Sequence, residues 1–268
     1  MRLFAFGCSF TSFYWPTWAD ILGQQFDTYH NFGMCATGNE FIFHRLTEAQ
    51  ARYNITANDL VIIQWTNFAR EDRYKNGRWV PSGNIFTQEV YPHNWVRDWF
   101  DLRGAFLKTS SVIAGATHLL ENTGCEFHFT SMMPMAHIDM TKDEFIDTEV
   151  QDILTVYKKY YDTIKPSMAG YLFNSLPYCR NPEPIMAKYR SNQKEWREDN
   201  HPTPLQHLRY TKEIIIPSLR NNIALDDSID NFAKKWEEDI RNKKPGFVMN
   251  DDGWSAEDRY QKWHGELC

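Results

Sequence analysis

The chain has 268 residues, of which 42% are hydrophobic, and this size suits one globular domain with embellishments. Its formal net charge of -6, without a dense run of Lys and Arg, argues against nucleic-acid binding. The five cysteines are scattered without Cys-x-x-Cys spacing, which argues against both a disulfide framework and a zinc site.

Hydrophobic patterns along the chain predict strands and helices in alternation. The expected strands are Leu3 to Phe6, Thr28 to Phe32, Leu60 to Ile63 and Cys125 to Ser131. The expected helices are Trp15 to Gln25, a run that begins at Gly38-Asn39, Asp101 to Asn122, Glu149 to Ile164, and Thr203 to Leu219. This alternation predicts an α/β three-layer sandwich, in which helices cover both faces of a central parallel sheet, as in flavodoxin-like folds.

Two regions depart from this alternation. Residues from about Arg70 to Trp99 show no clear period, and we interpret them as an irregular, lid-like insertion. We assign residues 1–219 to the α/β domain and 220–268 to a polar C-terminal extension with one amphipathic stretch. No run approaches the roughly 20 apolar residues that span a bilayer, and the first apolar run is too short for a signal peptide. We therefore expect a cytoplasmic protein that does not contact membranes.

Three polar loops follow predicted strands and should meet, because the carboxyl ends of parallel strands lie at one edge of a sheet. These loops contain Ser9, Gly38 and Thr66-Asn67. A nucleophilic serine also needs a histidine base and usually a carboxylate that orients it. Asp199 and His201, which directly precede the last predicted helix, could supply both.

Simpler roles are open for the same residues. The Ser9 hydroxyl could satisfy backbone groups of a turn, and His201 could start a helix with Asp199 as its cap. Strand alternation turns Cys8 away from Ser9, so we expect a buried, inert thiol. We expect a structural role for His207, and the histidine spacings predict no metal site.

Four short blocks, in order, resemble the SGNH (GDSL-like) hydrolase family over residues 1 to about 219. The first three are Gly7-Cys8-Ser9-Phe10-Thr11, then Asn31-Phe32-Gly33 with Gly38-Asn39, then Gln64-Trp65-Thr66-Asn67, and the last is Asp199-Asn200-His201-Pro202. Cysteine stands where the family most often has aspartate, and the third block departs from the usual Gly-x-Asn-Asp. The family's commoner acid position, three residues before the histidine, holds Glu198.

The resemblance implies a role for each matching residue. It makes Ser9 the nucleophile, His201 the base and Asp199 the orienting acid, with Glu198 as a competitor. It also implies an oxyanion hole formed by the backbone N–H groups of Ser9 and Gly38 and by the side-chain amide of Asn67, for which Thr66 is the alternative. No cofactor or metal is implied.

We therefore expect a serine esterase that hydrolyses a carboxylic ester through an acyl-Ser9 intermediate. By analogy with the family, and because the chain is rich in aromatic residues, an O-acetyl group on a carbohydrate is the preferred substrate, either a small molecule or a glycan. One alternative is a carbohydrate-binding or structural protein of a virion or cell surface that keeps the fold with little catalysis. The other is an O-acyltransferase that uses the same serine.

Overall fold

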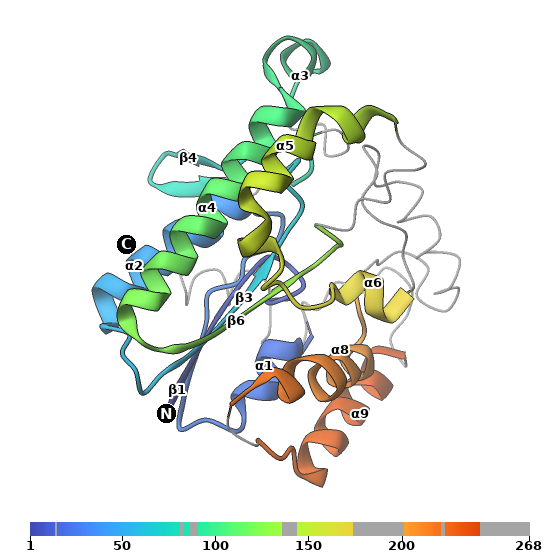
Figure 1. Ribbon diagram of the computed structural model, residues 1–268. Coiled ribbons are helices and arrows are strands. Elements are labelled where there is room, and N and C mark those ends of the chain that lie inside the picture. Colours follow the sequence, from blue (N-terminus) through green and yellow to red (C-terminus); the bar gives the residue numbers. More distant parts are fainter. Residues whose placement is uncertain are drawn as a thin grey trace.

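The computed structural model describes residues 1–13, 15–80, 83–85, 91–135, 144–173, 201–220 and 223–241. Within these ranges, four parallel strands form a central sheet in the order β2-β1-β3-β6 (Figure 1). The strands are β1 (Arg2–Phe6), β2 (Thr28–Asn31), β3 (Leu60–Trp65) and β6 (Glu126–Ser131). This is the flavodoxin-like order, and it brings the ends of β1 and β3 side by side.

The sheet is buried on both faces because its two central strands carry apolar side chains on both sides. Phe4 and Phe6 of β1 point into one core cluster, and Leu3 and Ala5 point into the other. All six residues of β3 are buried, which explains why its sequence shows no polar alternation.

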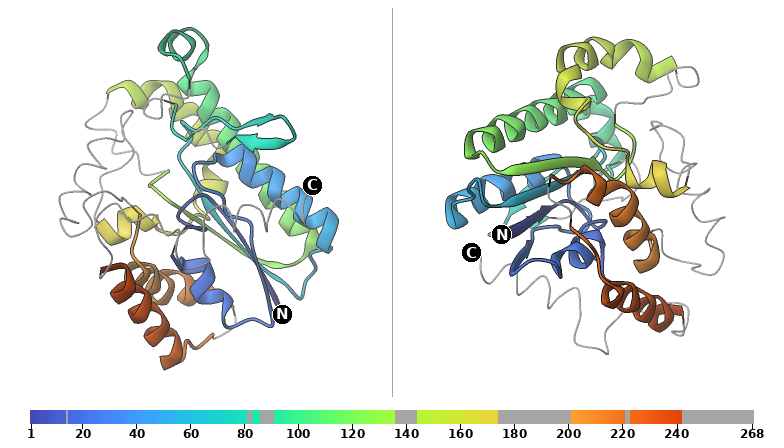
Figure 2. Two further views of the ribbon diagram at one scale, coloured as in Figure 1. Left: turned by 180° about the vertical axis from the view of Figure 1, so that it is seen from behind. Right: turned by 60° about the horizontal axis from the view of Figure 1, so that its bottom comes forward.

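In the part of the chain that the structure describes, helices cover both faces of the sheet (Figures 1 and 2). On the first face lie α2 (Asn39–Tyr53), α4 (Leu102–Thr123) and α5 (Glu144–Tyr161). On the second face lie α1 (Trp18–Gly23), α6 (Met168–Phe173) and α8 (Pro204–Tyr210). The predicted three-layer α/β architecture is therefore confirmed. Among the described helices, none is both long and apolar enough to cross a membrane.

The insertion is more regular than the sequence suggested. It contains the antiparallel hairpin β4 (Arg73–Lys75) and β5 (Arg78–Val80), followed by helix α3 (His93–Trp99). The hairpin turns at Asn76-Gly77, where both residues have positive φ, at 54° and 75°. Asn-Gly favours this backbone in a two-residue hairpin turn, so a local signal for the hairpin was present.

The helix expected from Thr203 to Leu219 is not continuous. After α8 the backbone widens into a π-helical turn, η1 (Thr211–Ile215), and then tightens into a 3₁₀ turn, η2 (Ile216–Ser218). Pro217 lies in this last turn, and because proline lacks an N–H group it cannot continue α-helical hydrogen bonding.

Part of the C-terminal extension packs on the domain. Helix α9 (Asp227–Arg241) places Ile229 and Ala233 against Ile21 of α1 and Leu208 of α8. The Glu237 carboxylate also accepts a hydrogen bond from the backbone N–H of Leu205 at 3.2 Å. Residues 242–268, with Trp254 and Trp263, lie outside the described ranges.

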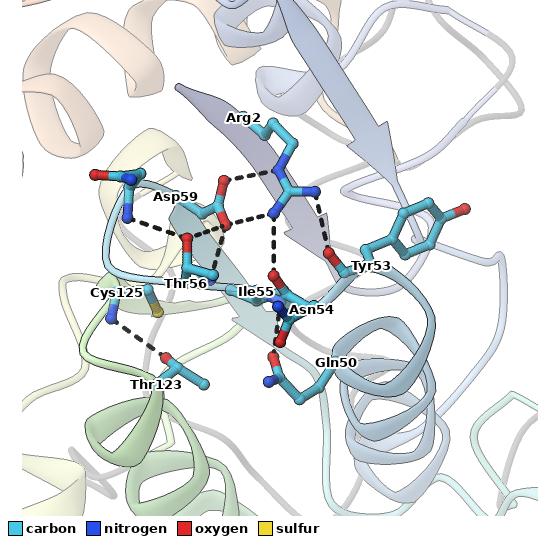
Figure 3. A network of polar contacts seen from close by, with 10 residues as sticks. Arg2, Gln50, Tyr53, Asn54, Ile55, Thr56, Asp59, Thr123 and Cys125 are labelled. Carbon is cyan, nitrogen blue, oxygen red and sulfur yellow. Dashed lines mark hydrogen bonds and ion pairs between the residues drawn. The ribbon is translucent and has the colours of Figure 1, made fainter.

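A polar network lies at the edge of the sheet where β1 and β3 begin, that is, at the amino-terminal ends of these strands (Figure 3). Arg2 donates to both carboxylate oxygens of Asp59, at 2.8 and 2.7 Å, and to the carbonyl oxygens of Tyr53 and Asn54. Burial raises the pKa of Asp59, but hydrogen bonds from Arg2 and Thr56 outweigh that effect and hold the pKa below its ordinary value. This network joins the two central strands away from the strand ends discussed next.

Candidate active site

Ser9 lies in a tight turn directly after β1. The backbone N–H groups of Thr11 and Ser12 both donate to the carbonyl oxygen of Cys8, at 2.9 and 3.1 Å. The Thr11 hydroxyl donates to Gln64 Oε1 on β3 at 3.1 Å. Gly7 permits this turn, because a Cβ atom there would lie 2.0 Å from Thr11 Oγ1. The turn leaves Ser9 at the carboxyl edge of the sheet, 5% exposed.

Cys8 is buried next to Met132, the residue that directly follows β6. Its side chain is fully buried, and its thiol lies 3.5 Å from the Met132 sulfur. The prediction of a buried Cys8 is confirmed, and the thiol is not placed to act as a surface nucleophile.

His201 lies against the loop that carries Ser9. Its imidazole stacks on Phe13 with ring centroids 3.7 Å apart and meets Phe10 edge-on at 5.5 Å. The next residue is anchored as well, since Trp15 Nε1 donates to the carbonyl oxygen of Pro202 at 2.8 Å, across 187 residues of sequence. The two sequence blocks are thus held together by aromatic contacts and one buried hydrogen bond.

The acid of the predicted triad lies outside the described ranges. Asp199 and its competitor Glu198 both fall in residues 174–200. The choice between these two carboxylates therefore stays a prediction.

The backbone N–H of Gly38 is held by a carboxylate that the sequence analysis did not assign to the site. Gly38 caps α2, and its N–H donates to Asp72 Oδ1 at 2.7 Å, while the N–H of Phe41 donates to Asp72 Oδ2 at 2.8 Å. Burial raises the pKa of Asp72 to about 6, against the effect of these two hydrogen bonds. In this arrangement the Gly38 amide is engaged, and its oxyanion role stays a prediction that requires Asp72 to release it.

Thr66 and Asn67 differ in what their side chains do. The Asn39 side chain accepts from the Thr66 N–H at 2.8 Å and donates to the Thr66 carbonyl oxygen at 3.0 Å. The Thr66 hydroxyl faces the Met132 sulfur at 3.8 Å. Asn67 Oδ1 accepts from the N–H of Ala69 at 2.7 Å, and Asn67 Nδ2 has no hydrogen bond among the described residues. The oxyanion role of Asn67, with Thr66 as the alternative, stays a prediction.

Met132 joins three of these segments and was missed by the sequence analysis. Its thioether is met by Cys8 at 3.5 Å, by Thr66 at 3.8 Å and by Arg70 Nη2 at 3.7 Å. Because Met132 directly follows β6, the rule that strand ends converge could have found it.

His207 is the most perturbed titratable side chain near His201. It is fully buried on α8, and among the described residues neither ring nitrogen has a hydrogen-bond partner. Burial, with a smaller contribution from the nearby His201, lowers the pKa of His207 to about 3. The imidazole is thus neutral at physiological pH, consistent with the structural role expected for it. Within the described ranges, no three His, Cys, Asp or Glu side chains gather closely enough to hold a metal ion.

Comparison with known proteins gives a likeness in fold only. No protein-family model matches the chain, and no curated protein matches it. A GDSL-like lipase from Bacteroides thetaiotaomicron is similar over 86% of this chain and 88% of its own, with 13% identity and a TM-score of 0.40. A member of the lipolytic G-D-S-L family from Veillonella parvula is similar over 72% of this chain and 98% of its own, with 14% identity and a TM-score of 0.36. At these values the likeness supports no inference about activity or individual residues, which must come from the site itself.

Proposed function

We propose that the protein is a serine hydrolase that cleaves a carboxylic ester through an acyl-Ser9 intermediate. The observation that carries this proposal is the contact between the Ser9 loop and the His201 segment. His201 stacks on Phe13 at 3.7 Å, and Trp15 binds the carbonyl oxygen of Pro202 at 2.8 Å. These contacts bring a histidine from the far end of the domain to the loop that carries the serine.

The chemistry follows from the roles of these groups. Ser9 Oγ attacks the ester carbonyl carbon while His201 takes its proton, and His201 then protonates the departing alkoxide. Water, activated by His201, hydrolyses the acyl-enzyme and restores the Ser9 hydroxyl. Asp199 is the proposed acid that orients His201, with Glu198 as the alternative.

Two proposed donors stabilise the oxyanion in the arrangement described, namely the backbone N–H of Ser9 and the Nδ2 amide of Asn67. Gly38 is the third donor only when Asp72 no longer occupies its N–H. An O-acetyl group on a carbohydrate remains the proposed substrate, because the chain is rich in aromatic residues of the kind that bind sugars.

The hydrogen bond between Gly38 and Asp72 favours one alternative specifically. A carboxylate on an expected oxyanion donor suits a carbohydrate-binding protein that keeps the fold but turns over slowly. The two proposals differ in turnover and in labelling of the serine, so one experiment separates them.

The test treats the purified protein with a fluorophosphonate probe and with para-nitrophenyl acetate, and compares wild type with Ser9→Ala and His201→Ala. Ser111→Ala and His93→Ala, which remove exposed side chains on α4 and α3, are the matched controls. We expect labelling at Ser9 and loss of turnover only in the two site variants. An unlabelled Ser9 with equal turnover in all five proteins would refute the enzyme proposal.

A further inference from the structure

Arg70 places a cation at the Gly38 loop of the candidate site. It follows β3, and its Nη1 donates to the carbonyl oxygen of Thr37 at 2.9 Å, one residue before Gly38. Its Nη2 lies 3.7 Å from the Met132 sulfur, which also lies 3.5 Å from the Cys8 thiol. The guanidinium therefore contacts the Gly38 loop and the residue that directly follows β6, which in turn contacts Cys8.

The Arg70 guanidinium makes no direct ion pair with a described carboxylate. Its contacts are a neutral carbonyl and a thioether, which is a weak acceptor, and its buried Nε atom has no hydrogen-bond partner. Asp72, which acts on Arg70 electrostatically, is committed to the N–H groups of Gly38 and Phe41.

Two other shielded arginines in the described ranges are paired. Arg2 binds Asp59 at 2.7 Å, and the buried Arg45 binds Glu48 at 3.0 Å. An arginine stays charged in proteins, and a shielded charge without a counter-ion is costly. A half-buried arginine that keeps unused donors at a candidate active site is therefore best explained by an anion that arrives with the ligand.

We infer that Arg70 binds an oxyanionic group, a carboxylate or a phosphate, on the ester substrate. This inference rests on the proposed hydrolase function and narrows its substrate class to anionic esters. The planar fork of a guanidinium matches both groups in a bidentate contact, and the bond to Thr37 fixes its orientation before the ligand binds. Arg70 is thus a specificity-determining residue rather than a group that acts on the reacting carbonyl.

Kinetics with two matched esters test this role. The mono-para-nitrophenyl ester of succinic acid and para-nitrophenyl butyrate have acyl chains of equal length, but only the first carries a carboxylate. We expect wild type to prefer the succinate ester, and Arg70→Gln to reduce the ratio of the two kcat/KM values about tenfold or more, through KM. Arg70→Lys, which keeps the charge without the fork, should retain part of the preference. Arg78→Gln, an exposed arginine on β5, is the charge-matched control and should keep the wild-type ratio.

Binding separates this inference from the proposed hydrolysis. In a Ser9→Ala background, calorimetric titration with succinate and with inorganic phosphate should show binding of one of them that Arg70→Gln abolishes. Binding that depends on Arg70, together with a ratio of the two kcat/KM values that Arg70→Gln does not change, would still support the inference. The anionic group would then belong to the alcohol part of the natural ester and not to its acyl part. If wild type cleaves neither ester, the hydrolase proposal fails while the binding result still decides the role of Arg70. Affinities for succinate and for phosphate that are the same with and without Arg70 would overturn the inference.

Discussion

Replacing His207 with leucine should remove a pH-dependent loss of stability. His207 is fully buried and has no hydrogen-bond partner in the described part of the chain, and burial lowers its pKa to about 3, against 6.5 for an ordinary histidine. Between these two values the unfolded chain binds a proton that the folded protein excludes. The free energy of unfolding therefore falls as the pH is lowered through 6.5, and it is not reduced by this group above that pH.

The size of the effect follows from the two pKa values. A pH of 5 lies about 1.5 units below the pKa of His207 in the unfolded chain. At about 1.4 kcal/mol per unit, protonation of His207 there stabilises the unfolded state by about 2 kcal/mol. At pH 7.5 the same contribution is close to zero. The free energy of unfolding of His207→Leu minus that of wild type should therefore be about 2 kcal/mol larger at pH 5 than at pH 7.5.

Urea unfolding of both proteins at the two pH values, followed by tryptophan fluorescence, measures this difference. A packing defect caused by leucine acts equally at both pH values and cancels. His93→Leu, which removes an exposed imidazole on α3, is the control and should show no such difference. If His207→Leu has the same relative stability at pH 5 and 7.5, then His207 takes up its proton in the folded protein and the reasoning from its burial is wrong.

The other predictions concern carboxylates and the contact between distant segments. Because burial raises the pKa of Asp72 to about 6, the stability of wild type relative to Asp72→Asn should fall by about 2 kcal/mol as the pH rises from 4 to 7, which urea unfolding of both proteins at the two pH values measures. Asp59→Asn removes the carboxylate that binds Arg2 and should lower the free energy of unfolding by about 1–3 kcal/mol at neutral pH, without a change in KM. Trp15→Phe keeps an aromatic ring but loses the N–H that donates to the Pro202 carbonyl oxygen. We therefore expect kcat to fall, and Ser9 to be labelled by the fluorophosphonate probe, but more slowly than in wild type. For the acid, Asp199→Asn should reduce kcat more than Glu198→Gln, and the reverse order would exchange their assignments.

Much of the fold was predictable because its signals are local. The strand at Leu60–Trp65 is a continuous apolar run, which predicts burial on both faces, and the sheet does bury it on both. The hairpin at Asn76-Gly77 had an equally local signal, which was hidden in a segment without hydrophobic periodicity. The π-helical turn at Thr211–Ile215 had no such signal, and only the nearby Pro217 indicates that the helix must change there.

The candidate site depends on contacts that no local pattern encodes. Ser9, Gly38 and Asn67 could be assigned to one edge because strand ends converge in any parallel sheet. The hydrogen bond between Gly38 and Asp72 could not be predicted, because it depends on how the insertion folds back over α2. The burial of the His207 ring without a hydrogen bond among the described residues could not be predicted either, because it depends on how several elements pack around α8.

The hydrogen bond between the Trp15 side chain and the Pro202 carbonyl oxygen has a consequence for folding during synthesis. The segment that follows Pro202 forms α8, and Tyr210 and Ile215 complete the core of the second face of the sheet. A nascent chain that has emerged only as far as α6 therefore carries Ser9 but lacks both the histidine and part of the packing that closes this face. Because His201 directly precedes the segment that covers the second face of the sheet, the same folding step should cover this face and bring the histidine to the Ser9 loop. A chain interrupted before that step should expose apolar surface that chaperones bind, and it should not hydrolyse esters.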